Sequence, residues 1–181
     1  YGTEKYVEQC LDSILNQTWQ NIEVLAVNDA SPGNAGEILS SYENIDNRVR
    51  TVDNIQNLGL FRARLEGAKR ASGKYIIFID SDDYVGIDYI RQLVEIAEKE
   101  QADIVKGQFV MDDRMQQEMY IYPYINYRPR LSLQGQDIAD HYFAQEGLDF
   151  SWHIVCAKLY STKLWRQCEP YYEKVQAHLV M

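Results

Sequence analysis

The sequence has 181 residues, enough for one large domain or a domain with a small additional lobe. Its 18 basic and 27 acidic residues give a net charge of −9, which argues against nucleic acid as the main ligand, because clustered positive charge binds phosphate backbones. The hydrophobic share of 46% and the charged share of 25% exclude a disordered or fibrous chain. The longest wholly apolar run, Tyr75 to Ile79, is too short to cross a bilayer.

Helix and strand patterns alternate over residues 1–111. Apolar residues at three-to-four spacing predict a helix over 4–17 with Thr3 as its N-cap, and another over 87–100. The other expected elements are a strand over 22–28, a helix over 34–43, a strand over 48–53, a helix over 60–71, a strand over 74–79 and a strand over 102–111. This alternation predicts an α/β fold with a mostly parallel central sheet flanked by helices. Because such units open on a strand, we expect a first strand to be missing from this chain.

From residue 112 onward the pattern is less regular and predicts a smaller C-terminal lobe of the same domain. The expected elements there are a helix over 136–144, a segment over 150–160 and a last one from Leu164. Three cysteines, Cys10, Cys156 and Cys168, are odd in number and lack C-x-x-C spacing, which favours a reducing compartment. Cys10 falls on the apolar stripe of its helix, where we expect it simply to pack.

The strongest chemical signal is an acidic run, Phe78-Ile79-Asp80-Ser81-Asp82-Asp83-Tyr84, directly after a buried strand. Open α/β sheets bind ligands at this end of their strands. Two carboxylates about 5 Å apart repel by roughly 3 kcal/mol at an effective dielectric near 20, so crowding them favours a bound cation. Oxygen ligands favour Mg²⁺ or Mn²⁺. The alternative is an acidic turn that caps the next helix through Asp83 or Asp88.

Two further positions follow strands. Asp29, after the strand over 22–28, is well placed to bind a nucleotide's ribose or base, or else is a turn aspartate that bonds its own backbone. The turn Asn57-Leu58-Gly59 precedes a helix with Arg62 and Arg64 and is expected to present free N–H groups to an anion. A basic helix face that is only solvated is the alternative.

Together these residues resemble the nucleotide-sugar half of the family 2 glycosyltransferases, which have the GT-A fold. The matching stretches are Glu8 to Thr18, Val27 to Pro32, Asn57 to Gly59 with Ala63-Arg64 and Gly67, Gly73 to Tyr75, and Asp80 to Asp83. The resemblance covers Tyr1 to about Met111 firmly, and residues 152–165 more loosely through Lys158-Leu159-Tyr160. It implies that residues 1–111 form the nucleotide-sugar-binding half and residues 112–181 an incomplete acceptor-side half.

The resemblance also implies residue roles. Asp29 would bind the base and Asp80 the ribose, while Asp82, with Asp80, would hold the Mn²⁺ or Mg²⁺ that bridges the diphosphate. Arg64 would help to shape the nucleotide pocket. The other expected nucleotide contacts are Tyr1, Asn57, Gly59 and Ser81. The expected acceptor contacts are Trp152 and Lys158.

The implied reaction is hexosyl transfer, with inversion, from a nucleotide-diphosphate sugar, expected to be UDP-linked, to a hydroxyl of a saccharide or lipid-linked acceptor. This implies a role in polysaccharide or glycoconjugate synthesis. The expected location is the cytoplasm, and peripheral association with the inner face of the membrane is left open. Two departures from the family pattern stand out. Leu65 occupies a position where the family usually has Asn, and the Glu-Asp pair that normally contains the general base is absent, so no base is named.

Two alternative functions remain from the sequence. The first is a non-catalytic domain of the same fold that binds nucleotide or sugar. The second is a Mg²⁺-dependent phosphohydrolase with an Asp-x-Asp nucleophile. Tyr84 argues against the second, because it stands where that fold usually has threonine, and the motif follows a later strand than the first.

Overall fold

The computed structural model describes residues 2–108, 110–113, 118–121, 132–138, 140 and 155–172. Two compact units are present. One contains the described residues up to 105 and those from 158 onward, and the other contains the described residues between 106 and 157. In the second unit, strands β5 (Val110–Asp113) and β6 (Glu118–Ile121) pair antiparallel, with Val110 opposite Ile121.

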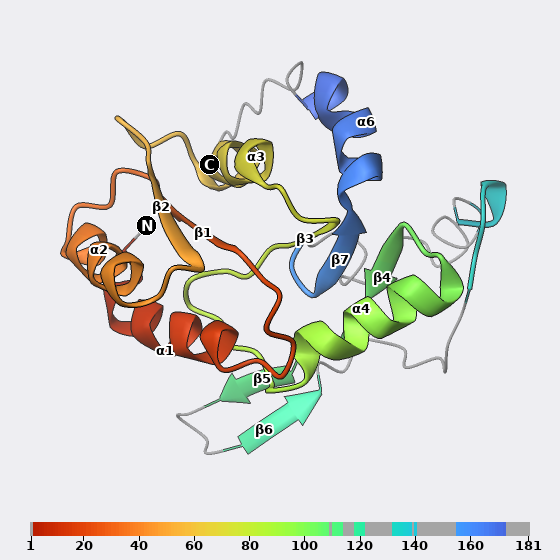
Figure 1. The fold of residues 1–181 in the computed structure, drawn as a ribbon, viewed down its shortest axis with the longest axis horizontal. Helices are drawn as coiled ribbons and strands as arrows, with labels where there is room; N and C mark the ends of the chain where they lie inside the picture. Colours follow the sequence, from red (N-terminus) through yellow and green to blue (C-terminus); the bar gives the residue numbers. More distant parts are fainter. Residues whose placement is uncertain are drawn as a thin grey trace. The chain divides into compact units, whose positions relative to one another are not determined.

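The first unit contains the helices and strands that position the candidate site (Figure 1). Its helices are α1 (Glu4–Leu15), α2 (Ala35–Ile45), α3 (Leu60–Arg70), α4 (Tyr89–Glu100) and α6 (Thr162–Tyr172). Its strands are β1 (Val24–Asn28), β2 (Val49–Asp53), β3 (Tyr75–Ile77), β7 (Lys158–Ser161) and β4 (Ile104–Lys106), the last of which ends at the border of the second unit. Every helix and strand predicted over residues 4–100 is present, within a few residues of its expected ends.

The sheet pairing corrects one expectation. Strands β1 and β2 are parallel, as predicted, with Val24 opposite Val49. Strand β3, however, pairs antiparallel with β7, Tyr75 lying opposite Ser161, and β7 separates β3 from β4. The sequence pattern missed this because β7 comes from the less regular last third of the chain, outside the regular helix–strand alternation.

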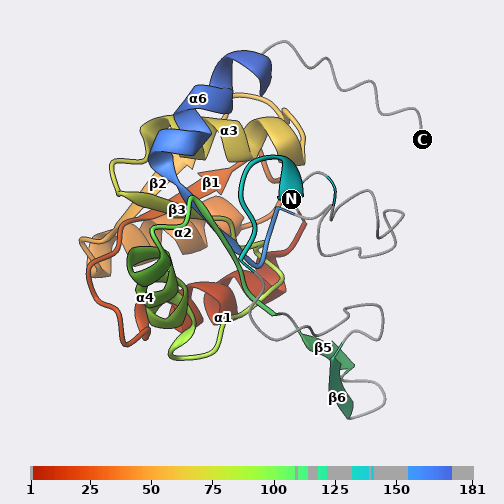
Figure 2. The same cartoon turned by 90° about the vertical axis from the view of Figure 1, so that its right-hand side faces the viewer.

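Helices cover both faces of these strands, as Figure 2 shows, with α3 and α6 on one side and α1 and α4 on the other. On β1, Val24 and Ala26 face a core formed with α1 and α2. Val27 points to the opposite face, toward α3. There Gly67 permits a close approach, because a Cβ at Gly67 would lie 3.0 Å from the Val27 Cγ2 atom.

Three smaller expectations have definite outcomes. The strand predicted over 102–111 is two separate strands, because β4 ends at Lys106 and β5 begins at Val110; between them the N–H of Gly107 donates to the carbonyl of Ala157. Cys10 is buried, and none of the three cysteines, all of which the structure describes, forms a disulfide. The helix predicted over 136–144 is described only at 136–138 and 140, where it is helical.

Within the part of the chain that the structure describes, no helix has both the length and the apolar character needed to cross a bilayer.

Candidate nucleotide and metal site

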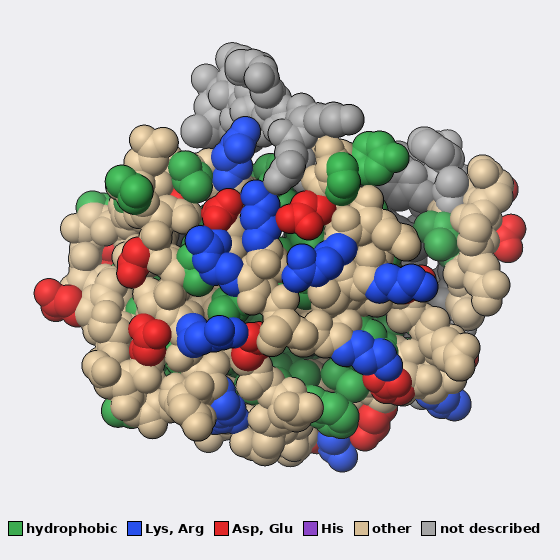
Figure 3. Space-filling view, turned by 45° about the horizontal axis from the view of Figure 1, so that its top comes forward, with side chains coloured by type: hydrophobic (Ala, Val, Ile, Leu, Met, Phe, Trp, Pro, Cys, Tyr) green, Lys and Arg blue, Asp and Glu red, His purple; other side chains and the backbone are tan. Residues whose placement is uncertain are grey.

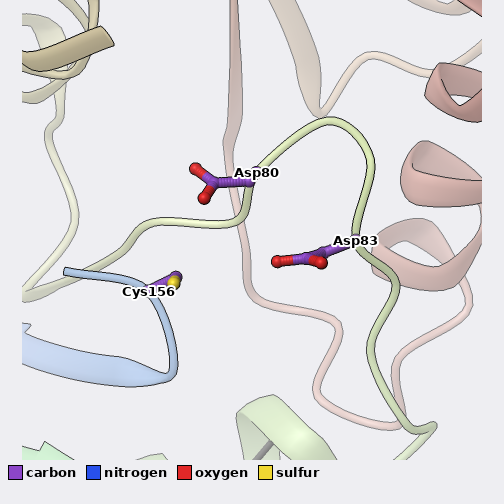
Figure 4. A group of neighbouring side chains, drawn as sticks. All are labelled: Asp80, Asp83 and Cys156. Carbon is purple, nitrogen blue, oxygen red and sulfur yellow. The ribbon is translucent and has the colours of Figure 1, made fainter. Parts of the chain in front are cut away.

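The acidic run forms a tight turn at the end of β3. Its entry is fixed by Phe78, whose ring centroid lies 4.8 Å from that of Trp165 and 6.2 Å from that of Tyr160. The turn closes through the N–H of Asp83, which donates to the carbonyl of Asp80 at 2.9 Å. Carboxylate oxygens of Asp80 and Asp83 lie within 4.8 Å of each other, and Figure 4 shows both side chains extending in the same direction.

Negative charge is concentrated at this turn. Partial burial, together with the charges of Asp80 and Asp82, raises the pKa of the Asp83 carboxyl. Burial, with a smaller effect of Asp83, Asp80 and Asp82, raises the pKa of the Cys10 thiol to about 12. The guanidinium of Arg64, on α3, forms an ion pair with Asp80 at 2.5 Å. Crowded carboxylate oxygens are the donor set that a hard divalent cation prefers, so the residues present fit Mg²⁺ or Mn²⁺.

Asp29 organises a second loop beside the strand ends. Its carboxylate is 8% exposed and accepts hydrogen bonds from the Asn54 side chain at 2.7 Å, the Leu58 N–H at 2.9 and 3.0 Å, and the Gly59 N–H at 2.9 Å. Each carboxylate oxygen therefore accepts two hydrogen bonds, and the Leu58 N–H is shared between the two oxygens. These four hydrogen bonds use the roughly four acceptor positions of the group. Asp29 therefore holds the loop between β2 and α3 in place.

The turn before α3 differs from its expected form. Gly59 is the N-cap residue of the helix and has a φ of 83°, a left-handed conformation that favours glycine. Its N–H is bonded to Asp29 and also to the Asn57 side chain, at 3.0 Å. The N–H groups of Leu58 and Gly59, which were expected to be free for an anion, are thus already hydrogen-bonded to the Asp29 carboxylate.

The structure places the predicted site residues in two groups. Asp80, Ser81 and Arg64 come together at the acidic turn, where the Ser81 hydroxyl lies 2.6 Å from that of Thr3. Thr3 is the N-cap residue by position, but its side chain makes no capping bond. The second group is Asp29 with Asn57 and Gly59.

The other predicted positions have mixed outcomes. Asp82 is exposed, within the acidic turn. Lys158 is buried at the start of β7. Leu65, where the family usually has Asn, is a buried core residue packed with Ala68 and Trp165. Tyr1 and Trp152 lie outside the described residues.

Sequence reasoning placed Asp83 in the crowded acidic run but named only Asp82 and Asp80 as metal ligands, and it left Thr3 as a simple helix cap. The acidic run itself contained a signal for Asp83, because one face of a tight turn presents residues three apart. For the contact between Thr3 and Ser81, which are 78 positions apart, the sequence offers no signal. Asp88, the alternative capping residue, is the N-cap of α4 without a side-chain capping bond, and accepts instead from the Thr18 hydroxyl at 2.7 Å.

Positive charge borders the acidic turn on one side. Figure 3 shows Lys and Arg side chains gathered on the face that α3 and α6 form, with Asp and Glu side chains between them. The basic residues of these helices are Arg62, Arg64, Lys69, Arg70, Lys163 and Arg166. Several are paired with acids, as Arg70 is with Glu66 at 2.7 Å. The two helices together carry six basic and two acidic residues, in a chain whose net charge is −9.

Comparison with known proteins identifies the family. Residues 1–154 match the description Glycosyl transferase family 2. The chain is 33% identical to glycosyltransferase GlyA of Streptococcus pneumoniae over 168 residues, which is 92% of this chain and 24% of GlyA. It is 45% identical to the uncharacterized glycosyltransferase EpsJ of Bacillus subtilis over 105 residues, 58% of this chain and 30% of EpsJ.

Solved structures agree on the fold. The crystal structure of S. aureus TarS in complex with UDP matches 98% of this chain and 49% of the TarS chain with a TM-score of 0.71 at 20% identity. The chain thus belongs to the family 2 glycosyltransferases and has an α/β fold that matches a GT-A enzyme. It spans about a quarter of the length of GlyA, under a third of EpsJ and about half of that TarS chain.

Proposed function

We propose that this chain contains the donor-binding part of an inverting glycosyltransferase that uses a UDP-linked sugar and acts in polysaccharide or glycoconjugate synthesis. The observation that carries this proposal is the acidic turn at the end of β3, paired with Arg64, in a family 2 chain. Related proteins support the donor class, since TarS has been crystallised with UDP and with UDP-GlcNAc. A Bacillus spizizenii relative, 34% identical over 110 residues, is a poly(ribitol-phosphate) beta-glucosyltransferase, which supports hexosyl transfer.

In this proposal the acidic turn binds the donor through a divalent cation. Asp82 and Asp80 would hold Mn²⁺ or Mg²⁺, with Asp83 close to Asp80. When bound, such an ion neutralises charge that develops on the leaving nucleoside diphosphate. A mannosyltransferase from Pyrobaculum calidifontis, with a TM-score of 0.55 to this chain, was solved with GDP-Man and Mn²⁺.

The remaining roles concern the nucleoside and the acceptor. Asp29 would bind the base, Asp80 would also contact the ribose, and the other nucleotide contacts would be Tyr1, Asn57, Gly59, Arg64 and Ser81. Asp29 can do so by exchanging one of its loop bonds for a donor on the base. Lys158 and Trp152 would contact a saccharide or lipid-linked acceptor, in the cytoplasm or at the inner membrane face. Residues 1–111 would form the donor half and 112–181 the acceptor half.

Calorimetry with UDP in the presence of Mn²⁺ tests the donor site. We expect saturable binding that disappears with EDTA and that Asp82→Ala weakens at least about tenfold. Removal of a residue that only orients a metal ligand costs about tenfold or more in metal affinity, and removal of the ligand itself should cost no less. The matched control is Glu95→Ala, which removes an exposed carboxylate from α4, away from the turn. Unchanged affinity in Asp82→Ala, or an equal loss in Glu95→Ala, would contradict the metal role.

The alternative of a non-catalytic domain that binds nucleotide or sugar is tested separately. A panel of UDP-sugars and GDP-mannose is incubated with the protein and Mn²⁺, and release of the nucleoside diphosphate is measured. Turnover with one of them supports the transferase. UDP binding without turnover of any donor favours a domain that only binds nucleotide or sugar.

A further inference from the structure

Residues of helix α1 and of the chain next to its two ends form a row of contacts along the acidic loop, which is residues 80–88 between β3 and α4, and with the first turn of α4. At the loop's entry the Thr3 hydroxyl lies 2.6 Å from that of Ser81. At its exit the Ser13 hydroxyl accepts from the N–H of Val85 at 3.1 Å. These two contacts lie on either side of Asp82 and Asp83, so α1 and its N-cap residue hold the chain before and after these two carboxylates.

Gln17 completes this row. It is 1% exposed, and its amide nitrogen donates to the carbonyl of Gly86 at 2.7 Å and to that of Ser13 at 2.9 Å. Its amide oxygen accepts from the N–H of Ile90 at 2.9 Å. The N-cap residue of α4, Asp88, makes no side-chain capping bond. The bond from Ile90 to Gln17 therefore gives a partner to an N–H in the first turn of α4, where N–H groups lack partners within the helix. Next to it, the N–H of Thr18 donates to the carbonyl of Ile87 at 2.9 Å.

These contacts oppose the electrostatics of the loop. Three carboxylates within four residues repel one another and favour loop conformations that spread them apart. Backbone bonds from Val85, Gly86 and Ile90 to side chains of one rigid helix and its end restrict the loop to conformations in which the carboxylates remain close. Ser13, on α1, and Gln17, two residues beyond its end, are linked directly, because the Gln17 amide donates to the Ser13 carbonyl.

We propose that Ser13 and Gln17 are positioning residues for the donor's cation site, acting on Asp80, Asp82 and Asp83 through the backbone of the acidic loop. The inference rests on the proposed function of that loop. It gives a role to the stretch Ser13 to Thr18, which is part of the match to the family but has no chemistry of its own. Neither residue touches the donor in this proposal, and both act by fixing where the carboxylates lie.

Ser13 offers the milder test, because its removal leaves Gln17 in the core. We expect Ser13→Ala to weaken UDP binding in Mn²⁺ about tenfold, the lower end of what removal of a ligand-orienting neighbour costs. Ser13→Thr keeps the hydroxyl and is expected to restore affinity to within about twofold. The matched control is Ser41→Ala on α2, where the hydroxyl bonds only its own helix, at the Ile38 carbonyl, at 2.7 Å.

A double-mutant cycle separates positioning from general destabilisation. If Ser13 acts through the acidic loop, Ser13→Ala has little further effect on UDP affinity in the Asp82→Ala background, while the losses in unfolding free energy still add. If Ser13→Ala lowers affinity equally in the wild-type and Asp82→Ala backgrounds, or leaves the wild-type Kd unchanged, the positioning role is overturned while the proposed function is retained. Gln17→Glu, which keeps the acceptor for Ile90 and loses the donor to Gly86, is expected to weaken binding in the same direction.

The same measurements distinguish the inference from the function on which it rests. A wild-type protein that binds no UDP in Mn²⁺ overturns the proposed function and this inference together. A wild-type protein that binds, and loses affinity in Asp82→Ala but not in Ser13→Ala, retains the function and loses only the positioning role.

Discussion

At the scale of single residues, Asp29 shows how one buried carboxylate can shape the loop before a helix. Its partners Asn54, Leu58 and Gly59 lie 25 to 30 positions further along the chain, so Asp29 orders a distant loop, which differs from the expected alternative of a turn aspartate that bonds its own backbone. A carboxylate that first orders the loop before α3 can then present an already ordered surface to a nucleoside.

Replacement of Asp29 by Asn tests the loop-ordering role. The amide keeps the shape but turns one acceptor oxygen into a donor, which then faces backbone N–H groups. We expect Asp29→Asn to lower the free energy of unfolding by about 2 kcal/mol, within the range for leaving a buried donor unpaired. Urea denaturation measures this.

The matched control for Asp29 is Asp53→Asn, at an exposed carboxylate that accepts from the Asn28 side chain at 2.9 Å. It should cost well under 1 kcal/mol, because partly solvated groups recover bonds to water. Equal losses in the two variants would contradict a special role for Asp29 in the fold.

At the scale of elements, a hydrogen bond between side chains joins α1 and α2 beside the apolar core that they share. The Tyr42 hydroxyl, on α2, donates to the Asp12 carboxylate on α1 at 2.7 Å. Burial, followed by this hydrogen bond, raises the pKa of the Tyr42 phenol to about 12. A phenol with a raised pKa adds stability that is fully present below its unfolded value near 10 and is lost as the pH rises from 10 through 12.

Stability measured against pH tests this hydrogen bond. We expect Tyr42→Phe to cost about 1 kcal/mol or less at pH 8, since the contact is largely exposed, and to flatten the loss of stability between pH 10 and pH 12. Urea titrations across that range provide the measurement. Tyr75→Phe is the control, a tyrosine whose hydroxyl lies 3.1 Å from Glu98 outside this pair of helices. An unaltered alkaline decline in Tyr42→Phe would exclude Tyr42 as its source.

The elements of residues 4–100 could be predicted because their apolar spacing and turn residues are local signals. The acidic turn and the loop at Asp29 were likewise predicted as sites, because each follows a strand end. The contacts between α1 and the acidic loop could not be predicted, since Gln17 and Gly86 are 69 positions apart. The same holds for β7, whose partner strand is fixed by tertiary packing around Leu159 and not by local sequence.

At the scale of the whole molecule, charge is unevenly distributed. The chain carries −9 overall, yet α3 has four basic residues and one acidic residue, and it contributes Arg64 to the acidic turn. A net negative surface keeps a protein soluble but repels an anionic ligand, so local positive charge beside a binding site matters for approach. In the proposed function, the face of α3 and α6 would offset part of that repulsion for a nucleoside diphosphate.

The place of β7 between β3 and β4 also bears on the order of folding during synthesis. A nascent chain that ends before Lys158 already has Asp29, Arg64 and Asp80, but the edge of β3 that β7 covers is still unpaired. Pairs this distant in sequence form late, because a long loop must close first. We expect ribosome-bound chains truncated at Ala157 to be cleaved by protease near β3, and chains that continue through Tyr172 to resist. Equal resistance at both lengths would show that the ligand-binding end of the sheet matures without its last strand.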